Sequence, residues 1–257
     1  MIAERLKARF GTGGSAPRAG AREQLAREKL IVALDVPSAH AAKDLVDRLE
    51  GSCQWFKVGM ELFTACGPPV VKSLTDRGLS VFLDLKFHDI PSTVAGAVRS
   101  AAGLGVRMIT LHAGGGPAML EAARDALAGQ IDPPQLLAVT VLTSLNAEQL
   151  KALGIRRTAA KQVELLAKLG LKAGINGFVC SPEEVAELRG LTGTDGVLVT
   201  PGIRPAGAES GDQKRMATPA AALREGASYL VVGRPITQAP EPAAAAATIL
   251  AEMAEAI

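Results

Sequence analysis

Eight short apolar runs, each followed by a stretch of helical period, occupy the sequence from Leu30 to the C-terminus. The runs cover residues 30–36, 55–60, 80–87, 107–113, 136–143, 177–181, 196–202 and 229–236. Start signals for the intervening helices are found at Ser38, Pro91, Pro117, Pro182 and Pro219. Glycines that end helices come just before strands, at Gly78, Gly105 and Gly226. Eight βα units without a linker-like gap predict an α/β protein with a single (β/α)8 TIM barrel over residues 30–257.

A doubly wound open sheet is the alternative for a chain of 257 residues. Such a sheet usually has fewer strands and carries a glycine-rich phosphate turn after the first one. Here the corresponding turn is LDVPSAH, residues 34–40, which contains no glycine. The barrel is therefore the favoured fold.

Composition excludes several classes of protein. The net charge of +2 is small and the basic residues are scattered, which argues against a nucleic-acid partner. No apolar run approaches the roughly 18–20 residues that a membrane span needs. The three cysteines are odd in number and have no C-x-x-C spacing, which is typical of reduced thiols rather than of disulfides or a zinc site. We expect a cytoplasmic protein without a membrane partner.

Residues 1–29 differ from the rest, being basic and rich in arginine, glycine and alanine, with a glycine break at residues 11–14. The segment could be a transit peptide, which is basic and amphipathic. Three acidic residues (Glu4, Glu23 and Glu28) disfavour that interpretation. We expect a basic N-terminal extension that is loosely held or forms short helices outside the barrel domain.

The third run is unusual because it ends in charged residues, within the stretch VFLDLKFHDIPST of residues 81–93. Side chains alternate between the two faces of a strand. One face therefore carries the apolar Leu83, Leu85 and Phe87, and the other carries Phe82, Asp84, Lys86 and His88. In a (β/α)8 barrel the active site lies at the C-terminal ends of the strands. The second set therefore points into the predicted barrel mouth, with Asp89 just above.

Two neighbouring strands extend this charged set. Asp35 ends the first run and Lys57 lies in the second, so acids and bases alternate around the mouth. A lysine between carboxylates stays protonated, which suits a proton donor better than a Schiff-base nucleophile. A structural ion network is the alternative, but buried ion pairs add little stability. A metal site at Asp84, His88 and Asp89 is disfavoured because the lysine would repel the cation.

The last two strands end in TPGIRP (200–205) and VGRPIT (232–237). Loops after these strands are the usual phosphate site of a (β/α)8 barrel, where glycines let the backbone approach and arginines bind phosphate oxygens. Between them runs a long polar loop, residues 206–219, of a kind that often forms a lid. We expect a phosphate group to be bound here by residues that include Gly202, Arg204, Gly233 and Arg234.

Six motifs together closely resemble the bacterial-type orotidine 5'-phosphate decarboxylases, in the expected order over about residues 30–257. They are LIVALDV, FKVGMELF, FLDLKFHDIPST, AVTVLTS, VTPGIRPAGAESGDQKR and YLVVGRPIT. The D-x-K-x-x-D pattern alone is shared with related sugar-phosphate barrels. KFHDIP combined with GIRP, GDQ and GRPIT is far more specific.

The resemblance implies a role for each matching residue. Lys86 is implied to be the proton donor, with Asp84 against the substrate carboxylate and Lys57 and Asp35 on the ribose. Thr143 is implied to lie near the pyrimidine. The resemblance further implies a homodimer with shared active sites, into which Asp89 and Thr93 reach from the partner, and Ile90 beside them is expected to bind substrate. The residues implied to hold the phosphate and close the lid are Arg204, Gln213, Gly233 and Arg234, and Pro201 is expected to bind substrate beside them.

The implied reaction converts orotidine 5'-phosphate to UMP and CO₂ in pyrimidine biosynthesis. Neither a cofactor nor a metal is expected, because no thiamine, pyridoxal or metal signature is found. Three alternatives stay open at this point: a metal-dependent sugar-phosphate decarboxylase or synthase, a Schiff-base aldolase acting through Lys57 or Lys86, and a non-catalytic nucleotide-binding barrel.

Overall fold

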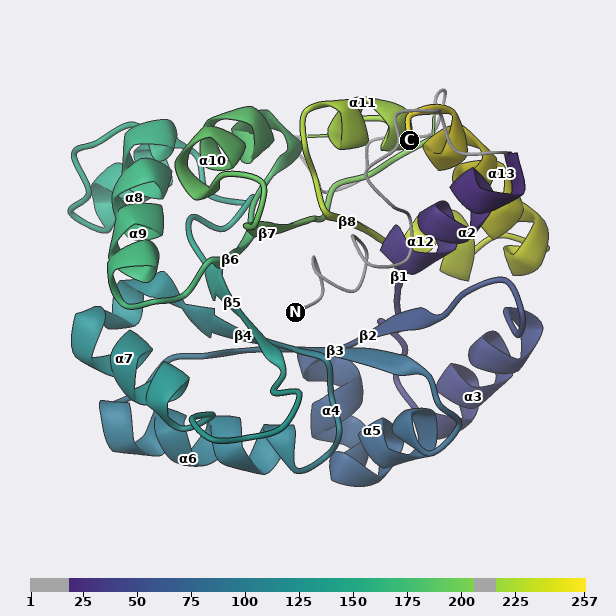
Figure 1. Cartoon of the computed structure of the whole chain (residues 1–257), viewed down its shortest axis with the longest axis horizontal. Coiled ribbons are helices and arrows are strands. Elements are labelled where there is room, and N and C mark those ends of the chain that lie inside the picture. Colours follow the sequence, from purple (N-terminus) through teal and green to yellow (C-terminus); the bar gives the residue numbers. More distant parts are fainter. Residues whose placement is uncertain (1–18, 206–215) are drawn as a thin grey trace.

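The computed structural model describes residues 19–205 and 216–257 and shows a closed barrel of eight parallel strands. The strands follow one another around the barrel in sequence order, and β8 pairs with β1 to close it. Figure 1 looks down this barrel and shows the helices as a ring outside the strands. The predicted (β/α)8 fold is confirmed.

Every predicted run overlaps one strand, although β5 begins one residue before its run and most strands end earlier than the run does. The strands are β1 Leu30–Ala33, β2 Trp55–Gly59, β3 Ser80–Phe87, β4 Met108–His112, β5 Gln135–Val139, β6 Gly177–Val179, β7 Val197–Thr200 and β8 Tyr229–Val232. The residues beyond these ends lie in the βα loops, and there they are free to line a site. Asp35, for example, lies two residues beyond the end of β1.

The helices begin where the sequence signals indicate. Proline takes the first helical position at the four predicted sites, and the Ser38 side chain accepts a hydrogen bond from the Ala41 N–H at 3.2 Å. The helices are α2 Ala19–Lys29, α3 Ala39–Arg48, α4 Met60–Cys66, α5 Pro68–Thr75, α6 Pro91–Ala102, α7 Pro117–Asp125, α8 Ala147–Ala152, α9 Ala159–Lys172, α10 Val185–Thr192, α11 Pro219–Arg224, α12 Arg234–Thr237 and α13 Pro242–Glu255, with 3₁₀ turns η1 Ala113–Gly115 and η2 Pro182–Glu184. None of these described helices is long and apolar enough to cross a membrane.

The core has two layers, as a filled barrel requires. The outer layer packs the helices on the outward faces of the strands. The inner layer fills the barrel with a smaller apolar cluster: Ile31, Ala33, Trp55, Phe82, Met108, Leu137, Val199, Tyr229 and Val231. The rings of Trp55 and Tyr229 lie 5.2 Å apart near the N-terminal ends of their strands. This cluster forms a floor beneath the C-terminal end of the barrel.

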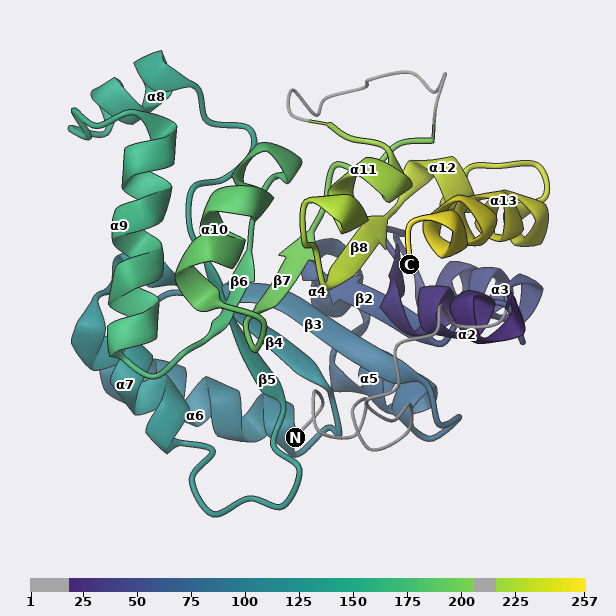
Figure 2. The ribbon, with the colours of Figure 1, turned by 45° about the horizontal axis from the view of Figure 1, so that its top comes forward.

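The N-terminal helix α2 packs against the C-terminal helix α13, side by side in Figures 1 and 2. Ala26 is fully buried in the outer core, and Arg27 donates a hydrogen bond to the Gly51 carbonyl at 2.7 Å. The second half of the expected extension, residues 19–29, is therefore one helix that covers part of the barrel. The glycine break at 11–14 lies outside the described residues.

The three cysteines are free thiols in the structure. Cys53 and Cys180 are buried, and burial raises the pKa of the Cys53 thiol to about 11 and that of Cys180 to about 12. Both thiols therefore stay protonated at neutral pH and are poor nucleophiles.

Candidate functional site

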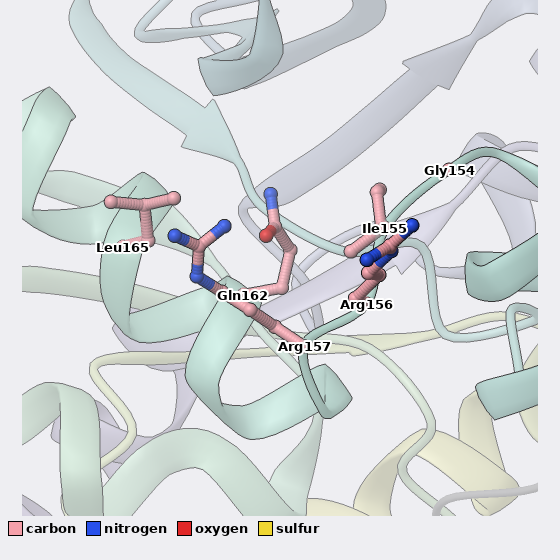
Figure 3. Close-up of a pocket in the computed structure, with 6 residues that line it drawn as sticks. All are labelled: Gly154, Ile155, Arg156, Arg157, Gln162 and Leu165. Carbon is pink, nitrogen blue, oxygen red and sulfur yellow. The ribbon is translucent and has the colours of Figure 1, made fainter.

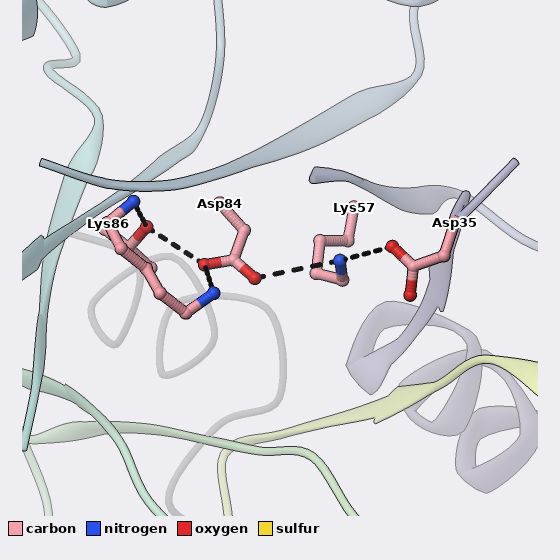
Figure 4. A network of polar contacts seen from close by, with 5 residues as sticks. Asp35, Lys57, Asp84 and Lys86 are labelled. Carbon is pink, nitrogen blue, oxygen red and sulfur yellow. Dashed lines mark hydrogen bonds and ion pairs between the residues drawn. The ribbon is translucent and has the colours of Figure 1, made fainter. Parts of the chain in front are cut away.

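Four charged side chains form one continuous row at the C-terminal end of the barrel (Figure 4). The Lys57 ammonium lies 2.8 Å from Asp35 Oδ1 and 3.7 Å from Asp84 Oδ2. The Lys86 ammonium lies 2.8 Å from Asp84 Oδ1. The order is acid, base, acid, base, as strand alternation predicts, because β1, β2 and β3 are neighbours in the sheet.

Burial differs along this row. Only 11% of the Lys57 side chain and 13% of the Asp84 side chain are exposed, whereas Asp35 at the outer end is 56% exposed. Removing charges from water costs free energy that their pairing repays only in part. A row of four charges facing a cavity is therefore a poor device for stability, and its fixed field is available to a bound molecule.

The end of β3 is bulged, and this decides where Lys86 lies. The register with β4 jumps from Leu83 opposite Ile109 to Phe87 opposite Leu111. Within the bulge Lys86 has a φ of 52°, a left-handed conformation that costs a non-glycine residue about 1 kcal/mol. The sequence gives no sign of this bulge, since strand alternation assumes a regular pleat.

The bulge also moves His88 out of the row, so the prediction that His88 shares a face with Asp84 and Lys86 is wrong. Its ring lies 5.2 Å from that of His112 and packs over the turn at Gly114 and Gly115. Burial, followed by the charges of His88 and Lys86, lowers the pKa of His112.

A buried threonine supports the bulge, and sequence reasoning missed it. The Thr110 hydroxyl accepts a hydrogen bond from the Lys86 backbone N–H at 2.8 Å and donates one to Asp84 Oδ1 at 3.0 Å. Thr110 is fully buried in the middle of β4. A polar residue at the centre of the run RMITLHA, flanked on both sides by apolar residues, is the signal that could have found it.

Gly59 makes room for the Lys57 ammonium. A Cβ atom at this position would lie 2.8 Å from Lys57 Nζ and 3.1 Å from Asp35 Oδ1. Its backbone is not left-handed, so the need for glycine here comes from space rather than from φ.

A cavity of about 510 Å³ lies above the apolar floor and joins the charged row to the loops after β7 and β8. Phe82 and Val231 form its base, and Asp35, Lys57, Asp84 and Lys86 line one side. The predicted site residues that also line it are Thr143, Pro201, Arg204, Gly233 and Arg234. Nine of the predicted site residues therefore meet around one space.

The loop after β7 is pinned at both of its described ends. The Arg204 N–H donates to the Ala217 carbonyl at 3.0 Å, and the Ala217 N–H donates to the Gly202 carbonyl at 3.3 Å. Gly202 has a φ of 82°, which glycine adopts freely. Gly233 is different, because a Cβ there would make only ordinary contact with Ala33 at 3.6 Å.

Comparison with known proteins identifies the family. The sequence profile of the "Orotidine 5'-phosphate decarboxylase / HUMPS family" matches residues 28–249. The chain belongs to this family.

Its relatives match at high identity and nearly full length. An orotidine 5'-phosphate decarboxylase from Moorella thermoacetica is 54% identical over 234 residues, covering 89% of this chain and 93% of the relative. One from Idiomarina loihiensis is 53% identical over 231 residues, covering 90% of this chain and all of the relative. The crystal structure of orotidine 5'-phosphate decarboxylase from Lactobacillus acidophilus superposes with a TM-score of 0.78 at 42% identity, covering 88% of this chain and 98% of that one.

Three predicted site residues of this family member do not line the cavity. Asp89, Ile90 and Thr93 lie on the turn after β3 and at the start of α6, and all three are exposed. The Asp89 carboxylate accepts a hydrogen bond from the Ile90 N–H at 2.6 Å. Gln213 and most of the expected lid, residues 206–215, lie outside the described residues.

The alternative metal set of Asp84, His88 and Asp89 is not assembled. Across residues 19–205 and 216–257, no group of three or more His, Cys, Asp or Glu side chains is arranged to hold a metal ion. The carboxylates of the row face ammonium groups instead.

A second cavity, of about 550 Å³, lies at the connection between α8 and α9. It is lined by Gly154, Ile155, Arg156, Arg157, Gln162 and Leu165. The side chains of Arg156 and Arg157 point apart in Figure 3 and do not converge on one point. The cavity that contains the charged row is therefore the candidate active site.

Proposed function

We propose that this chain is an orotidine 5'-phosphate decarboxylase, which converts orotidine 5'-phosphate to UMP and CO₂ in pyrimidine biosynthesis. The observation that carries the proposal is the alternating row Asp35–Lys57–Asp84–Lys86 on the wall of the cavity that also receives Arg204 and Arg234. Such a cavity offers a fixed cation for the reacting carbon and two arginines for the phosphate. The names of the relatives support the same reaction.

In the proposed reaction the bond between C6 and the carboxylate breaks, and its electron pair stays on C6. The Lys86 ammonium stabilises this carbanion and then donates a proton to C6, so that UMP and CO₂ are formed. Asp84 holds the ammonium at 2.8 Å and lies against the departing carboxylate. Enzymes lower barriers by about 8–23 kcal/mol, and charges fixed before the reaction supply much of this.

Lys57 and Asp35 complete the charge row and contact the ribose in this proposal, with Thr143 beside the pyrimidine. The phosphate is held by Arg234, Arg204 and the backbone N–H of Gly233, with Gln213 closing over it, and Pro201 lines the same cavity. Binding energy from the phosphate, which does not react, offsets strain at the reacting carbon.

We further propose that the enzyme works as a cytoplasmic homodimer with shared active sites. Asp89, Ile90 and Thr93 are exposed beside the mouth rather than in the cavity, and the Ile90 side chain is 63% exposed. A partner subunit would bury this apolar residue and receive all three side chains. Mixed dimers of Asp89→Ala and Lys86→Ala subunits then contain one intact site and regain activity. If subunits exchange and no activity returns, Asp89 acts within its own chain.

The decisive test is turnover of orotidine 5'-phosphate, followed by ultraviolet absorbance and by release of CO₂. We expect activity that survives a metal chelator and is not trapped by borohydride. Loss with the chelator would favour a metal-dependent sugar-phosphate enzyme, and covalent trapping would favour a Schiff-base aldolase. UMP binding without turnover would identify a non-catalytic nucleotide-binding barrel.

A further inference from the structure

Lys86 and Asp84 are both tied to one hydroxyl that does not line the cavity. The Thr110 oxygen accepts from the Lys86 backbone N–H at 2.8 Å and donates to Asp84 Oδ1 at 3.0 Å. The same Oδ1 accepts the Lys86 ammonium at 2.8 Å. A hydroxyl has one proton to give and two lone pairs, so both bonds form at once. The backbone, ammonium and carboxylate are thereby closed into one cycle.

The position of Thr110 opposite the bulge explains why a hydroxyl is needed. Ile109 and Leu111 pair with Leu83 and Phe87, so Thr110 faces the extra residues of β3. In the bulge the Lys86 N–H turns toward the Thr110 side chain for its acceptor. The side chain thus replaces a missing ladder bond and stabilises the left-handed φ of 52° at Lys86.

We propose that Thr110 is a positioning residue, which fixes the Lys86 ammonium and the Asp84 carboxylate at the distance that decarboxylation requires. It does not touch the substrate, since Thr110 is fully buried and Lys86 and Asp84 lie between it and the cavity. This role rests on the proposed decarboxylation, and it goes further by assigning the geometry of the catalytic pair to a residue of β4.

The test compares three variants and holds a fourth in reserve. Thr110→Val keeps the shape and removes the hydroxyl, and Thr110→Ser keeps the hydroxyl. Thr140→Val removes a buried hydroxyl just after the next strand, β5, and this oxygen has no hydrogen-bond partner among the described residues. Thr110→Cys serves as a second weakened donor if the valine variant does not fold.

We expect Thr110→Val to lower kcat roughly 10- to 100-fold, the loss that one hydrogen bond to a charged group implies. The Kd for UMP should change less than about threefold, because UMP lacks the carboxylate that meets the pair. Thr110→Ser and Thr140→Val should keep kcat within about threefold. A Thr110→Val enzyme with near-normal kcat, or an equal loss in Thr140→Val, would overturn the assignment.

A crystal structure of Thr110→Val separates this role from the reaction itself. We expect the φ of Lys86 to depart from its wild-type value of 52°, or the Lys86 ammonium to move by about 1 Å from Asp84. A shift of that size is large enough to lower the rate by about 100-fold. If Lys86 and Asp84 keep their wild-type geometry in this variant, the positioning role is refuted, whichever reaction the enzyme catalyses. A displaced pair in a chain that does not decarboxylate orotidine 5'-phosphate would uphold the role and refute the proposed function.

Discussion

The two ends of the barrel surround partly buried cations in opposite ways. At the N-terminal end, Arg189 of α10 donates only to neutral oxygens: the carbonyls of Gly193, Gly196 and Gly226 and the hydroxyl of Ser228. At the C-terminal end, Lys57 and Lys86 contact carboxylates and face a cavity. Arg189 ties α10 to the turns that lead into β7 and β8, so its contacts hold elements together.

The difference separates a partly buried charge that holds elements of the fold together from the charges that we propose take part in the reaction. All the Arg189 contacts that define its position are made within the protein, and burial lowers its pKa. The lysines at the mouth leave part of their charge available to a ligand, since 25% of the Lys86 side chain is exposed. Substitutions at the C-terminal mouth should therefore alter turnover, and substitution of Arg189 at the N-terminal end should alter stability.

The largest effect is expected for Lys86→Ala, which removes both the proposed proton donor and the cation that would face the carbanion. Loss of kcat should exceed about 10⁴-fold, beyond a typical general-acid deletion, because an electrostatic contribution is lost as well. Steady-state kinetics measures this, with Lys168→Ala on the surface of α9 as the matched control. UMP binding, measured by calorimetry, should survive.

A double-mutant cycle with Asp84→Ala sharpens this prediction. Asp84 holds Lys86 at 2.8 Å, so each single substitution already disables the pair. The double variant should lose little more than Lys86→Ala alone. Strictly additive losses would show that the two residues act independently.

Arg234→Ala should have the next largest effect, at the other side of the cavity. Charge-assisted contacts to a phosphate are worth roughly 1.5–3 kcal/mol each, so kcat/KM should fall by about 10- to 100-fold. The phosphate-free nucleoside should hardly respond, because it offers this arginine nothing to bind. Equal losses on both substrates would place Arg234 among the residues that support the fold.

Arg189→Met should affect stability instead of turnover. It keeps much of the side-chain volume but removes this donor from carbonyls that are at most partly shielded from water, at a cost of roughly 1–3 kcal/mol. Urea unfolding measures the loss, while kcat of the folded enzyme should stay near the wild-type value. A large fall in kcat would break the distinction between the two ends of the barrel.

The smallest effect concerns the pH dependence of stability at the same end. Burial, followed by the charge of Arg189, lowers the pKa of Lys29, which donates to the Ser228 carbonyl. Between this lowered pKa and 10.5, the unfolded chain holds a proton that the folded chain has released. The free energy of unfolding therefore rises with pH across that window. In Lys29→Met this part of the rise, measured by urea unfolding at several pH values, should disappear.

Much of this protein was determined by local sequence pattern. Apolar runs, prolines at helix starts and glycines at helix ends predicted the barrel, because each signal acts within a few residues of itself. Strand alternation placed Asp84, Lys57 and Asp35 in one row for the same reason. The loops at Arg204 and Arg234 could be predicted to lie together as a phosphate site, because they follow the last two strands of the barrel, which are adjacent.

Tertiary structure alone decided the features that depend on a neighbouring strand or helix. The bulge at Lys86 forms against β4, where the Thr110 hydroxyl replaces a ladder bond, and it turns His88 away from the row. Residues 19–29 become part of the barrel's cover only because α13 lies beside them. The alternation of side chains along a strand and the start of a helix depend on a few consecutive residues. The bulge at Lys86, the hydrogen bonds of Thr110 and the packing of α2 on α13 depend on atoms that the chain brings together only when it folds.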